Sequence, residues 1–350
     1  MKPSVKRLLN MLFILATLAL IVIIAFSNGE MTNAWTTLWT LDLRWVLCAL
    51  LGWFAYLFFD AVSLHCFLRK QHHRISMPYA TYVSLIGFYY GNITPGASGG
   101  QPMQIYYMNK KGIPVGVGSS AISLKFFCTQ AVTVLMASVL WLCNRDFVTA
   151  QLGGAQWAIV LGWCINFVAI PGILLVALCR PLVQAVLKFG VNVGAKLRLV
   201  KNPESAMLRA TSVLDTYHSS ILRIGRHPWQ IALQMLLAAL SMLGLMSVPL
   251  SVYHAFGLSG APWHQLLTVA FLLFLSASYT PLPGASGAQE GGFLVYYRGL
   301  FTQGTIGLAL LVWRFFTYYL FLIVGAVISI VGNLRSGRKK AESPAPPADT

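Results

Sequence analysis

Apolar residues run through this chain in long blocks that are separated by short polar or basic stretches. A helix needs about 20 consecutive apolar residues to cross the hydrocarbon core of a bilayer, which is roughly 30 Å thick. Blocks of about that length occupy residues 8–26, 45–67, 117–143, 157–179, 229–252 and 306–331. The pattern therefore predicts an all-α polytopic integral membrane protein with about six full spans.

One short phrase occurs twice, as PGASGGQ at residues 95–101 and as PGASGAQ at residues 283–289. Each copy follows an apolar block of about 17 residues, which is barely long enough to cross a bilayer. Glycine, proline and serine in quick succession do not continue a helix, and broken backbone survives at membrane depth only where protein or water receives its polar groups. We therefore expect two re-entrant helical hairpins, at residues 78–111 and 263–300. Their predicted turn positions are Pro95, Gly96, Gly99, Pro283, Gly284 and Gly287.

The distribution of lysine and arginine predicts the topology, because cytoplasmic loops carry an excess of both. If both hairpins are re-entrant, 20 of the 25 basic residues fall on one side, and this side also holds the two termini. Three full spans then separate the hairpins, so the two hairpins enter from opposite faces of the membrane. We expect opposed hairpins that form an inverted repeat, an arrangement typical of membrane transporters.

Composition supports a membrane protein and narrows the possible ligands. Hydrophobic residues make up 57% of the chain and charged residues 10%, whereas a soluble domain has about 25% charged residues. A net charge of +16 would indicate a nucleic-acid partner in a soluble protein, but here it follows the membrane topology, and no nucleic acid is expected. The six cysteines lack paired spacing, so we expect neither a metal site nor a disulfide framework, and no cofactor.

Residues 180–228 differ from the rest of the chain, with eight basic and only two acidic side chains. Asn202, Pro203 and Glu204 form a typical helix start, and apolar residues then recur at helical spacing. Two interpretations are open: a basic amphipathic helix on the cytoplasmic leaflet, or a linker that packs on the membrane domain. Residues 1–332 are expected to form one domain, and residues 333–350 a disordered basic tail rich in proline and alanine.

Lys125 and Arg314 lie within apolar blocks, and each is followed by two phenylalanines. A basic side chain near the bilayer centre costs about 3 kcal/mol on insertion scales, so each should have a partner or a water-filled cavity. Asp60 and Glu290 are available as partners. The two cations therefore form structural ion pairs, reach toward the membrane surface, or bind a lipid phosphate with Glu290 as the counter-charge or proton-linked group.

Polar side chains within or beside the repeated phrase are further candidates for substrate binding. A lipid head group would accept or donate hydrogen bonds to them, although the same groups could simply satisfy the broken backbone. The alternative for the whole phrase is close helix packing through small residues. The candidates are Ser98, Gln101, Ser286 and Gln289.

The second copy of the repeated phrase, with the residues beside it, resembles the signature of a known family. PLPGASGAQE at residues 281–290 is similar to the Pro-x-Pro-Gly-Gly-x-Gly-x-x-Glu signature of the lysylphosphatidylglycerol synthase transmembrane region, also called the flippase-like domain family. The resemblance covers about residues 8–332. Two features depart from the family pattern: Gln101 and Pro102 stand where an acidic residue is common, and Ala285 and Ser286 replace part of the glycine pattern.

The resemblance implies a multi-pass protein of the bacterial cytoplasmic membrane. In the bifunctional synthases, this membrane region is thought to move aminoacylated phosphatidylglycerol between leaflets and so to confer resistance to cationic antimicrobial peptides. Lysine transfer in those proteins belongs to a soluble domain after the membrane region. This chain ends nineteen residues after its last apolar block, so we expect that domain to be absent and a phosphatidylglycerol lysyltransferase name to be inherited only.

The function we expect is translocation of an anionic or aminoacylated phospholipid, or of a lipid-linked molecule. Phosphatidylglycerol and lysyl-phosphatidylglycerol are the implied lipids, with a separate synthase or a second copy of the chain as the implied partner. Two alternatives remain: a membrane subunit related to the lysyltransferases, and a transporter of a small soluble solute. The chain has no HExxH motif or paired Ser-His arrangement that would favour an enzyme.

Overall fold

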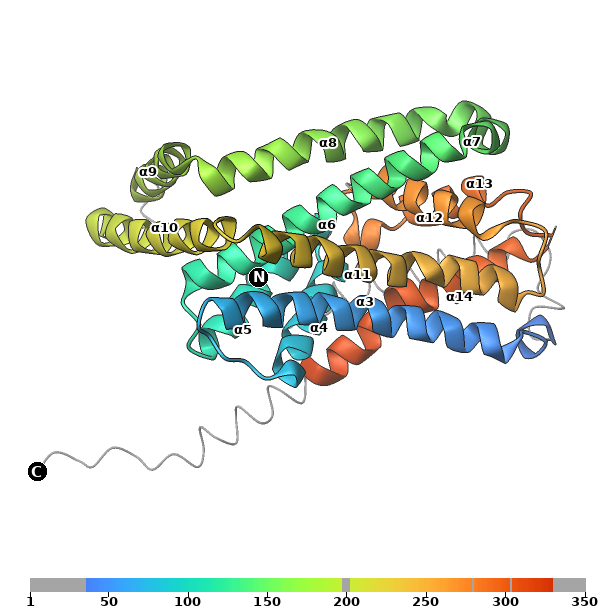
Figure 1. Cartoon of the computed structure of the whole chain (residues 1–350), viewed down its shortest axis with the longest axis horizontal. Helices are drawn as coiled ribbons and strands as arrows, with labels where there is room; N and C mark the ends of the chain where they lie inside the picture. Colours follow the sequence, from blue (N-terminus) through green and yellow to red (C-terminus); the bar gives the residue numbers. More distant parts are fainter. Residues whose placement is uncertain (1–35, 197–201, 279, 303, 330–350) are drawn as a thin grey trace, which may run out of the picture.

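The computed structural model describes residues 36–196, 202–278, 280–302 and 304–329. All regular elements in these ranges are helical, so the predicted all-α class is confirmed. The predicted span 8–26 and the predicted tail 333–350 lie outside the described residues. With the labels of Figure 1, the α-helices are α3 (Leu43–Lys70), α4 (Met77–Asn92), α5 (Gly100–Lys110), α6 (Val115–Cys143), α7 (Arg145–Leu152), α8 (Gln156–Leu178), α9 (Arg180–Lys196), α10 (Pro203–Gly225), α11 (Pro228–Ala255), α12 (Trp263–Ala277), α13 (Ala288–Tyr296) and α14 (Ile306–Arg314).

Five described segments are long and apolar enough to cross a membrane, and each coincides with a predicted span. They are Leu43–Lys70, Val115–Cys143, Arg145–Leu178, Pro228–Ala255 and Ile306–Ser329. The last of them begins as α14, passes through a π-helical turn, η4 (Phe315–Tyr319), and continues as a helix to Ser329. The chain is therefore a multi-pass membrane protein.

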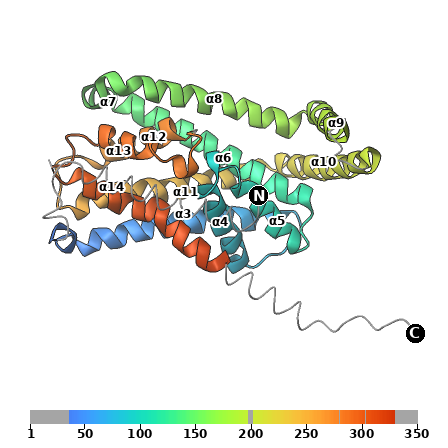
Figure 2. The ribbon, with the colours of Figure 1, turned by 180° about the vertical axis from the view of Figure 1, so that it is seen from behind.

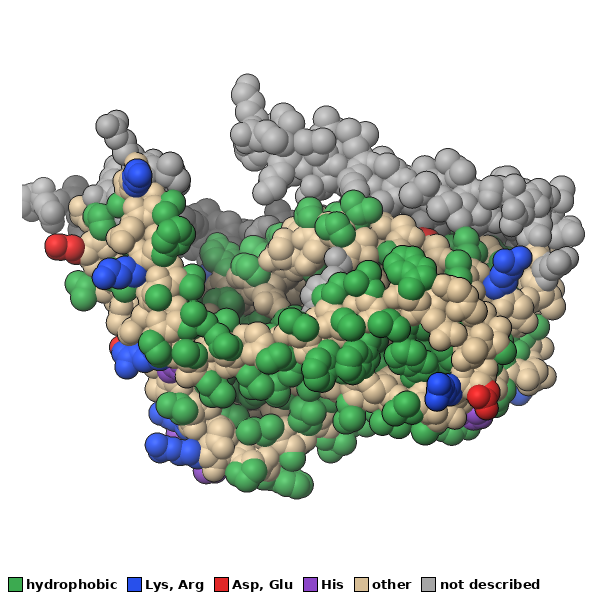
Figure 3. All heavy atoms as spheres, turned by 90° about the horizontal axis from the view of Figure 1, so that it is seen from above, with side chains coloured by type: hydrophobic (Ala, Val, Ile, Leu, Met, Phe, Trp, Pro, Cys, Tyr) green, Lys and Arg blue, Asp and Glu red, His purple; other side chains and the backbone are tan. Residues whose placement is uncertain are grey.

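The surface of the bundle matches a bilayer environment. The long helices run along the longest axis of the molecule in Figure 1. On the face shown in Figure 3, hydrophobic side chains cover the middle, whereas lysine and arginine side chains gather at the two ends. Trp157, Phe167 and Val168 of α8 are exposed on the outside of the bundle. An apolar belt between charged ends is the surface that lipid chains and head groups require.

Two pairs of helices are each interrupted by a short 3₁₀ turn. Turn η1 (Pro95–Ala97) separates α4 from α5, and turn η3 (Pro283–Ala285) separates α12 from α13. The helices of each pair pack on each other, so each pair folds back as a hairpin. Figures 1 and 2 show the α4–α5 hairpin toward the end of the bundle that carries α9 and α10, and the α12–α13 hairpin toward the end that carries α7. The two turns contact each other.

A stack of aromatic rings fixes α13 against α14. Phe293 of α13 stacks on Trp313 with ring centroids 4.8 Å apart, and on Tyr297 at 4.5 Å. All three side chains belong to the largest hydrophobic core of the molecule. Because Arg314 directly follows Trp313, this packing holds the arginine beside the start of α13.

Residues 180–228 form two helices with different surroundings. α10 packs against α6, and it buries Leu214, Tyr217 and Ile224. The Gln71 side-chain amide, just after α3, donates a hydrogen bond to the Ser220 carbonyl at 2.9 Å. α9, in contrast, contains no buried residue. The amphipathic pattern of α10 therefore reflects packing on the membrane domain.

Candidate functional site between the two broken hairpins

The two copies of the repeated phrase share the backbone conformation of the glycine and alanine that follow the proline, and diverge after them, since Gly99 has φ of −83° and Gly287 of +87°. Gly96 and Gly284 have φ of +58° and +61°, and the alanines after them, Ala97 and Ala285, have φ of +56° and +51°. A left-handed conformation is easy for glycine but costs an alanine about 1–2 kcal/mol. In both copies these two left-handed residues lie in the 3₁₀ turn between the two helices of the hairpin, and the two turns contact each other.

The turns differ in the group that accepts the next free N–H. The Gly99 N–H donates to the Thr94 hydroxyl oxygen at 2.8 Å, and that hydroxyl donates to the Tyr90 carbonyl at 2.6 Å. At the matching position of the second turn, the Gly287 N–H donates to the Glu290 carboxylate. The first hairpin is thus closed by a neutral side chain and the second by a charged one.

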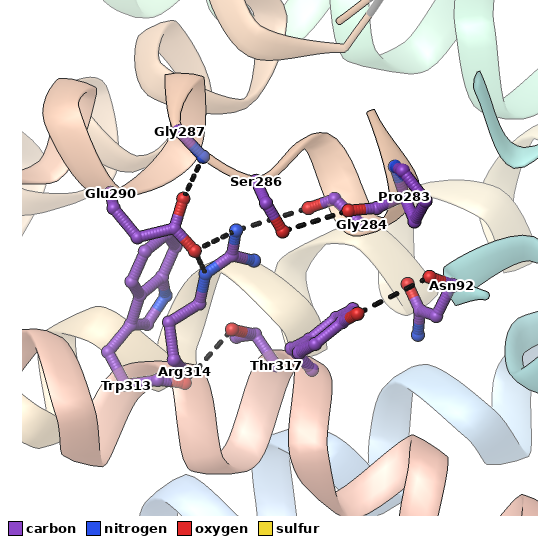
Figure 4. Close-up of polar contacts among 10 residues, drawn as sticks. Asn92, Pro283, Gly284, Ser286, Gly287, Glu290, Trp313, Arg314 and Thr317 are labelled. Atoms are coloured by element: carbon purple, nitrogen blue, oxygen red, sulfur yellow. Dashed lines mark hydrogen bonds and ion pairs between the residues drawn. The ribbon is translucent and has the colours of Figure 1, made fainter. Parts of the chain in front are cut away.

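Glu290 also binds Arg314, as Figure 4 shows. The arginine Nε lies 2.6 Å from Glu290 Oε1, and its Nη2 donates to the Gly284 carbonyl at 3.1 Å. Glu290 is 1% exposed and Arg314 4%. A buried pair of this kind depends on both partners, because either charge alone would remain desolvated and uncompensated. The arginine therefore links α14 to both the turn and the start of α13.

Tyr318 connects the second turn to the first hairpin. Its ring lies so close to Gly284 that a Cβ placed there would be 2.2 Å from a ring carbon. Its hydroxyl donates to the Asn92 carbonyl at the end of α4, at 3.4 Å (Figure 4). Tyr318 belongs to the π-helical turn η4, and such turns often occur at functional sites because they redirect side chains.

The second intramembrane cation is paired in the other half of the molecule. Lys125 Nζ on α6 lies 3.0 Å from Asp60 Oδ2 on α3. Their side chains are 13% and 11% exposed, so this pair is more accessible than the arginine pair. Both cations thus have a carboxylate partner, but Glu290 comes from the hairpin itself and Asp60 from a neighbouring full span.

A cavity of about 630 Å³ lies between the two hairpins. Both turns line it through Gly96 and Gly284, and both cations line it as well, together with Asp60. Glu290 does not reach the wall, because it lies behind Arg314. The cavity therefore gathers the duplicated turns, the Lys125–Asp60 pair and Arg314 in one space. Among the described residues, no cluster of histidine, cysteine, aspartate and glutamate could hold a metal ion.

Comparison with known proteins identifies the family. The model of the lysylphosphatidylglycerol synthase transmembrane region matches residues 9–325, which is most of the chain. The chain belongs to this family. No curated protein matches it.

The remaining site residues predicted from the sequence fall into two groups. Ser98, Gln101 and Gln289 line the cavity. The side chains of Ser98 and Gln101 are exposed there, and within the described ranges neither has a protein hydrogen-bond partner. Ser286 does not line the cavity: its hydroxyl donates to the Pro283 carbonyl at 2.8 Å and so closes the turn.

In this member of the lysylphosphatidylglycerol synthase transmembrane family, the hydrogen bonds of the two turns match a sequence difference between the two copies. Gln101 and Pro102 of the first copy carry no acidic group. Position 102 corresponds to Glu290 in the repeat, and the N–H that Glu290 accepts in the second hairpin is accepted by Thr94 in the first. The first hairpin therefore closes without a carboxylate of its own.

The cavity wall also contains groups that the sequence analysis did not single out. Tyr56, Phe88 and Phe321 contact one another, with centroids 4.7 to 5.8 Å apart, and form an aromatic wall from three helices. Gln130 also lines the cavity, and its amide donates to Asn166 on α8. The only sequence signal for Gln130 was a polar residue in an apolar block. Nothing in the sequence distinguishes the three aromatic residues from others in the spans.

Proposed function

We propose that this membrane domain moves an anionic or aminoacylated phospholipid, or a lipid-linked molecule, between the two leaflets. The observation that carries the proposal is a single cavity, lined by Lys125 and Arg314, at the meeting point of two broken hairpins. Membrane transporters place substrates at such breaks, because the freed backbone groups can bind a charged group there.

The membrane topology is part of the same proposal. The hairpins approach from opposite ends of the bundle, as expected if both are re-entrant and together form an inverted repeat. Three described spans, which contain α6, α8 and α11, separate them along the chain. In this arrangement the end with α9 and α10 is cytoplasmic, as are both termini, and the membrane is the bacterial inner membrane.

The cavity offers a phosphate several donors at once. α5 begins at Gly100 and α13 at Ala288, and the first N–H groups of a helix have no acceptor within the helix. Gln101 and Gln289 of these first turns line the cavity. A phosphate would accept from them and from the two cations, and it would compete with Asp60 and Glu290 for the positive charges. The released carboxylate of Asp60, which lines the cavity, is then free to receive an ammonium group of the cargo.

Apolar side chains in the cavity wall would contact the apolar part of the cargo. Phe126, Phe274 and Met246 line the cavity beside the polar groups. Such a wall accommodates the upper parts of acyl chains while the remainder stays in the bilayer. Transport would then proceed by alternate exposure of the head-group cavity to either side, with one hairpin moving relative to the other.

The direct test is lipid movement in liposomes that contain the purified full chain. Head-labelled phosphatidylglycerol and lysyl-phosphatidylglycerol are each followed with a membrane-impermeant quencher. We expect protein-dependent quenching of the inner-leaflet lipid. This quenching should be lost in the charge-neutral double variants Lys125→Gln/Asp60→Asn and Arg314→Gln/Glu290→Gln, which leave no unpaired buried charge.

Arg145→Gln serves as the matched control, since Arg145 is an exposed cation at the start of α7 and does not line the cavity. This variant should transport at the rate of the unmodified protein. Absence of movement for both lipids, in protein that elutes as a single folded species, would contradict the proposal. Uptake of a free phosphate ester by the same liposomes would then favour a transporter of small solutes.

If lysyl-phosphatidylglycerol moves, export of that lipid would lower the negative charge of the outer leaflet and support resistance to cationic antimicrobial peptides.

A further inference from the structure

Helix α9 has a different orientation from the helices that cross the membrane. In Figure 1, α8 runs along the long axis of the bundle, whereas α9 is seen nearly end-on. Only Cys179 separates the two helices, since α8 ends at Leu178 and α9 begins at Arg180. α9 therefore starts where a lipid-exposed span ends and runs across the direction of that span.

One face of α9 is apolar and open. Leu182, Val186, Phe189 and Val193 follow one another at spacings of four, three and four residues, so they form a single stripe. Their exposed fractions are 40%, 62%, 71% and 39%. The stripe continues the apolar surface at the end of α8, where Leu175 and Leu178 are 50% and 60% exposed.

The neighbouring edge of α9 is polar and positively charged. Lys188, Asn192 and Lys196 recur every four residues, about a quarter turn away from the apolar stripe. α9 contains no acidic residue. The third basic residue, Arg180, pairs with Asp215 of α10, on which α9 packs. An apolar face with lysines along its edge is the pattern of a helix that lies in the interface of an anionic leaflet.

We propose that α9 is an in-plane membrane helix that binds the head-group layer of anionic phospholipids. Its apolar stripe enters the boundary between head groups and acyl chains, and Lys188 and Lys196 contact the lipid phosphates. The occupant of the exposed face is thus lipid, as charge and continuity with α8 indicate. This binding surface is separate from the central cavity and does not depend on transport.

The proposal is tested by measuring how deeply single positions lie in vesicles that contain the full chain. In a background without the six native cysteines, Phe189→Cys, Asn192→Cys and Leu208→Cys are labelled with one small fluorophore. Leu208 is the matched apolar control, because it is 73% exposed on α10. Each probe is quenched either by aqueous iodide or by lipids that carry a nitroxide near the head group.

We expect the position 189 probe to be quenched by the nitroxide lipid and protected from iodide, and the position 208 probe to show the opposite. Position 192 should be accessible to both. Nitroxide quenching at position 189 should fall when vesicles contain phosphatidylcholine only instead of phosphatidylcholine with phosphatidylglycerol, and also in the Lys188→Gln/Lys196→Gln variant.

Iodide quenching at position 189 as strong as at position 208 would overturn the proposal. Protection from both quenchers would also overturn it, because a protein surface, such as a second copy of the chain, would then cover the stripe. No effect of phosphatidylglycerol or of the lysine substitutions would overturn the role of anionic lipid.

Discussion

At the scale of single residues, the main feature of this protein is that each intramembrane cation has its own carboxylate. The arginine pair is almost fully buried, with side-chain exposure of 5% and 2%, whereas the Lys125–Asp60 pair is open to the cavity. A buried ion pair contributes little net stability compared with apolar residues, but the loss of one partner costs about 3–5 kcal/mol. Charged side chains within the membrane thus cost free energy, and a bundle with a purely structural role would not need these pairs.

The pairing predicts a strongly non-additive effect on stability. Glu290→Gln leaves Arg314 buried without a counter-charge and keeps only one acceptor oxygen for two donors, the Gly287 N–H and the Arg314 Nε–H, so unfolding in detergent should become easier by about 3–5 kcal/mol. The Arg314→Gln/Glu290→Gln double variant should recover most of this loss, as measured by denaturant unfolding. If the double variant loses as much stability as Glu290→Gln and Arg314→Gln lose together when each is made alone, the pair does not act as a unit.

At the scale of elements, the two turns share the left-handed glycine and alanine but not their surroundings. No atom lies within 4 Å of a Cβ built on Gly96, whereas one built on Gly284 would overlap the Tyr318 ring. The first turn is thus open and the second is held. An asymmetry of this kind within a repeat allows one hairpin to move while the other serves as the fixed side of the cavity.

Matched alanine substitutions test this asymmetry. Gly96→Ala should cost about 1–2 kcal/mol, which is the strain of one more left-handed alanine. Gly284→Ala should cost roughly 1–3 kcal/mol more, because the new methyl group displaces Tyr318 as well. Thermal unfolding of both variants in the same detergent gives the comparison, and equal losses would show that the Tyr318 contact does not restrain the second turn.

The sequence predicted this level of organisation well, for physical reasons that also set its limits. Hydrophobic blocks give the described spans because a bilayer demands long apolar helices, and the repeated phrase marks both breaks because glycine and proline end helices wherever they cluster. The sequence offered both Asp60 and Glu290 as partners of Lys125 and could not decide between them. Asp60 lies 65 residues away along the chain, and no local pattern selects it. Periodicity likewise did not show that α10 packs on α6 while α9 remains open, because both helices are amphipathic.

At the scale of the whole molecule, the arrangement of hairpins predicts which loops share a side of the membrane. Gln151 of α7 donates to the Tyr296 carbonyl at 3.1 Å, so the end of α13 is fixed to α7. The loop after α5 lies at the other end of the bundle (Figure 1). Single cysteines at Lys110 and Arg298 should therefore react with an impermeant thiol reagent from opposite sides of intact cells or oriented vesicles.

A third position controls the labelling experiment. Arg145 begins α7, so a cysteine there should react from the same side as position 298. Labelling of positions 110 and 298 from one side would mean that at least one hairpin crosses the membrane completely, and the inverted repeat would have to be abandoned.

The paired charges have a further consequence for the energetics of the proposed transport cycle. Lys125, Asp60, Arg314 and Glu290 together carry no net charge when all four are ionised. An empty cavity that changes its exposure from one side to the other therefore moves no charge through the electric field of the membrane. A cargo with one negative charge does, at about 2.3 kcal/mol per 100 mV for a complete crossing. The membrane potential would thus act on the loaded step alone, and the charge of the lipid, rather than the protein, would set the voltage dependence of transport.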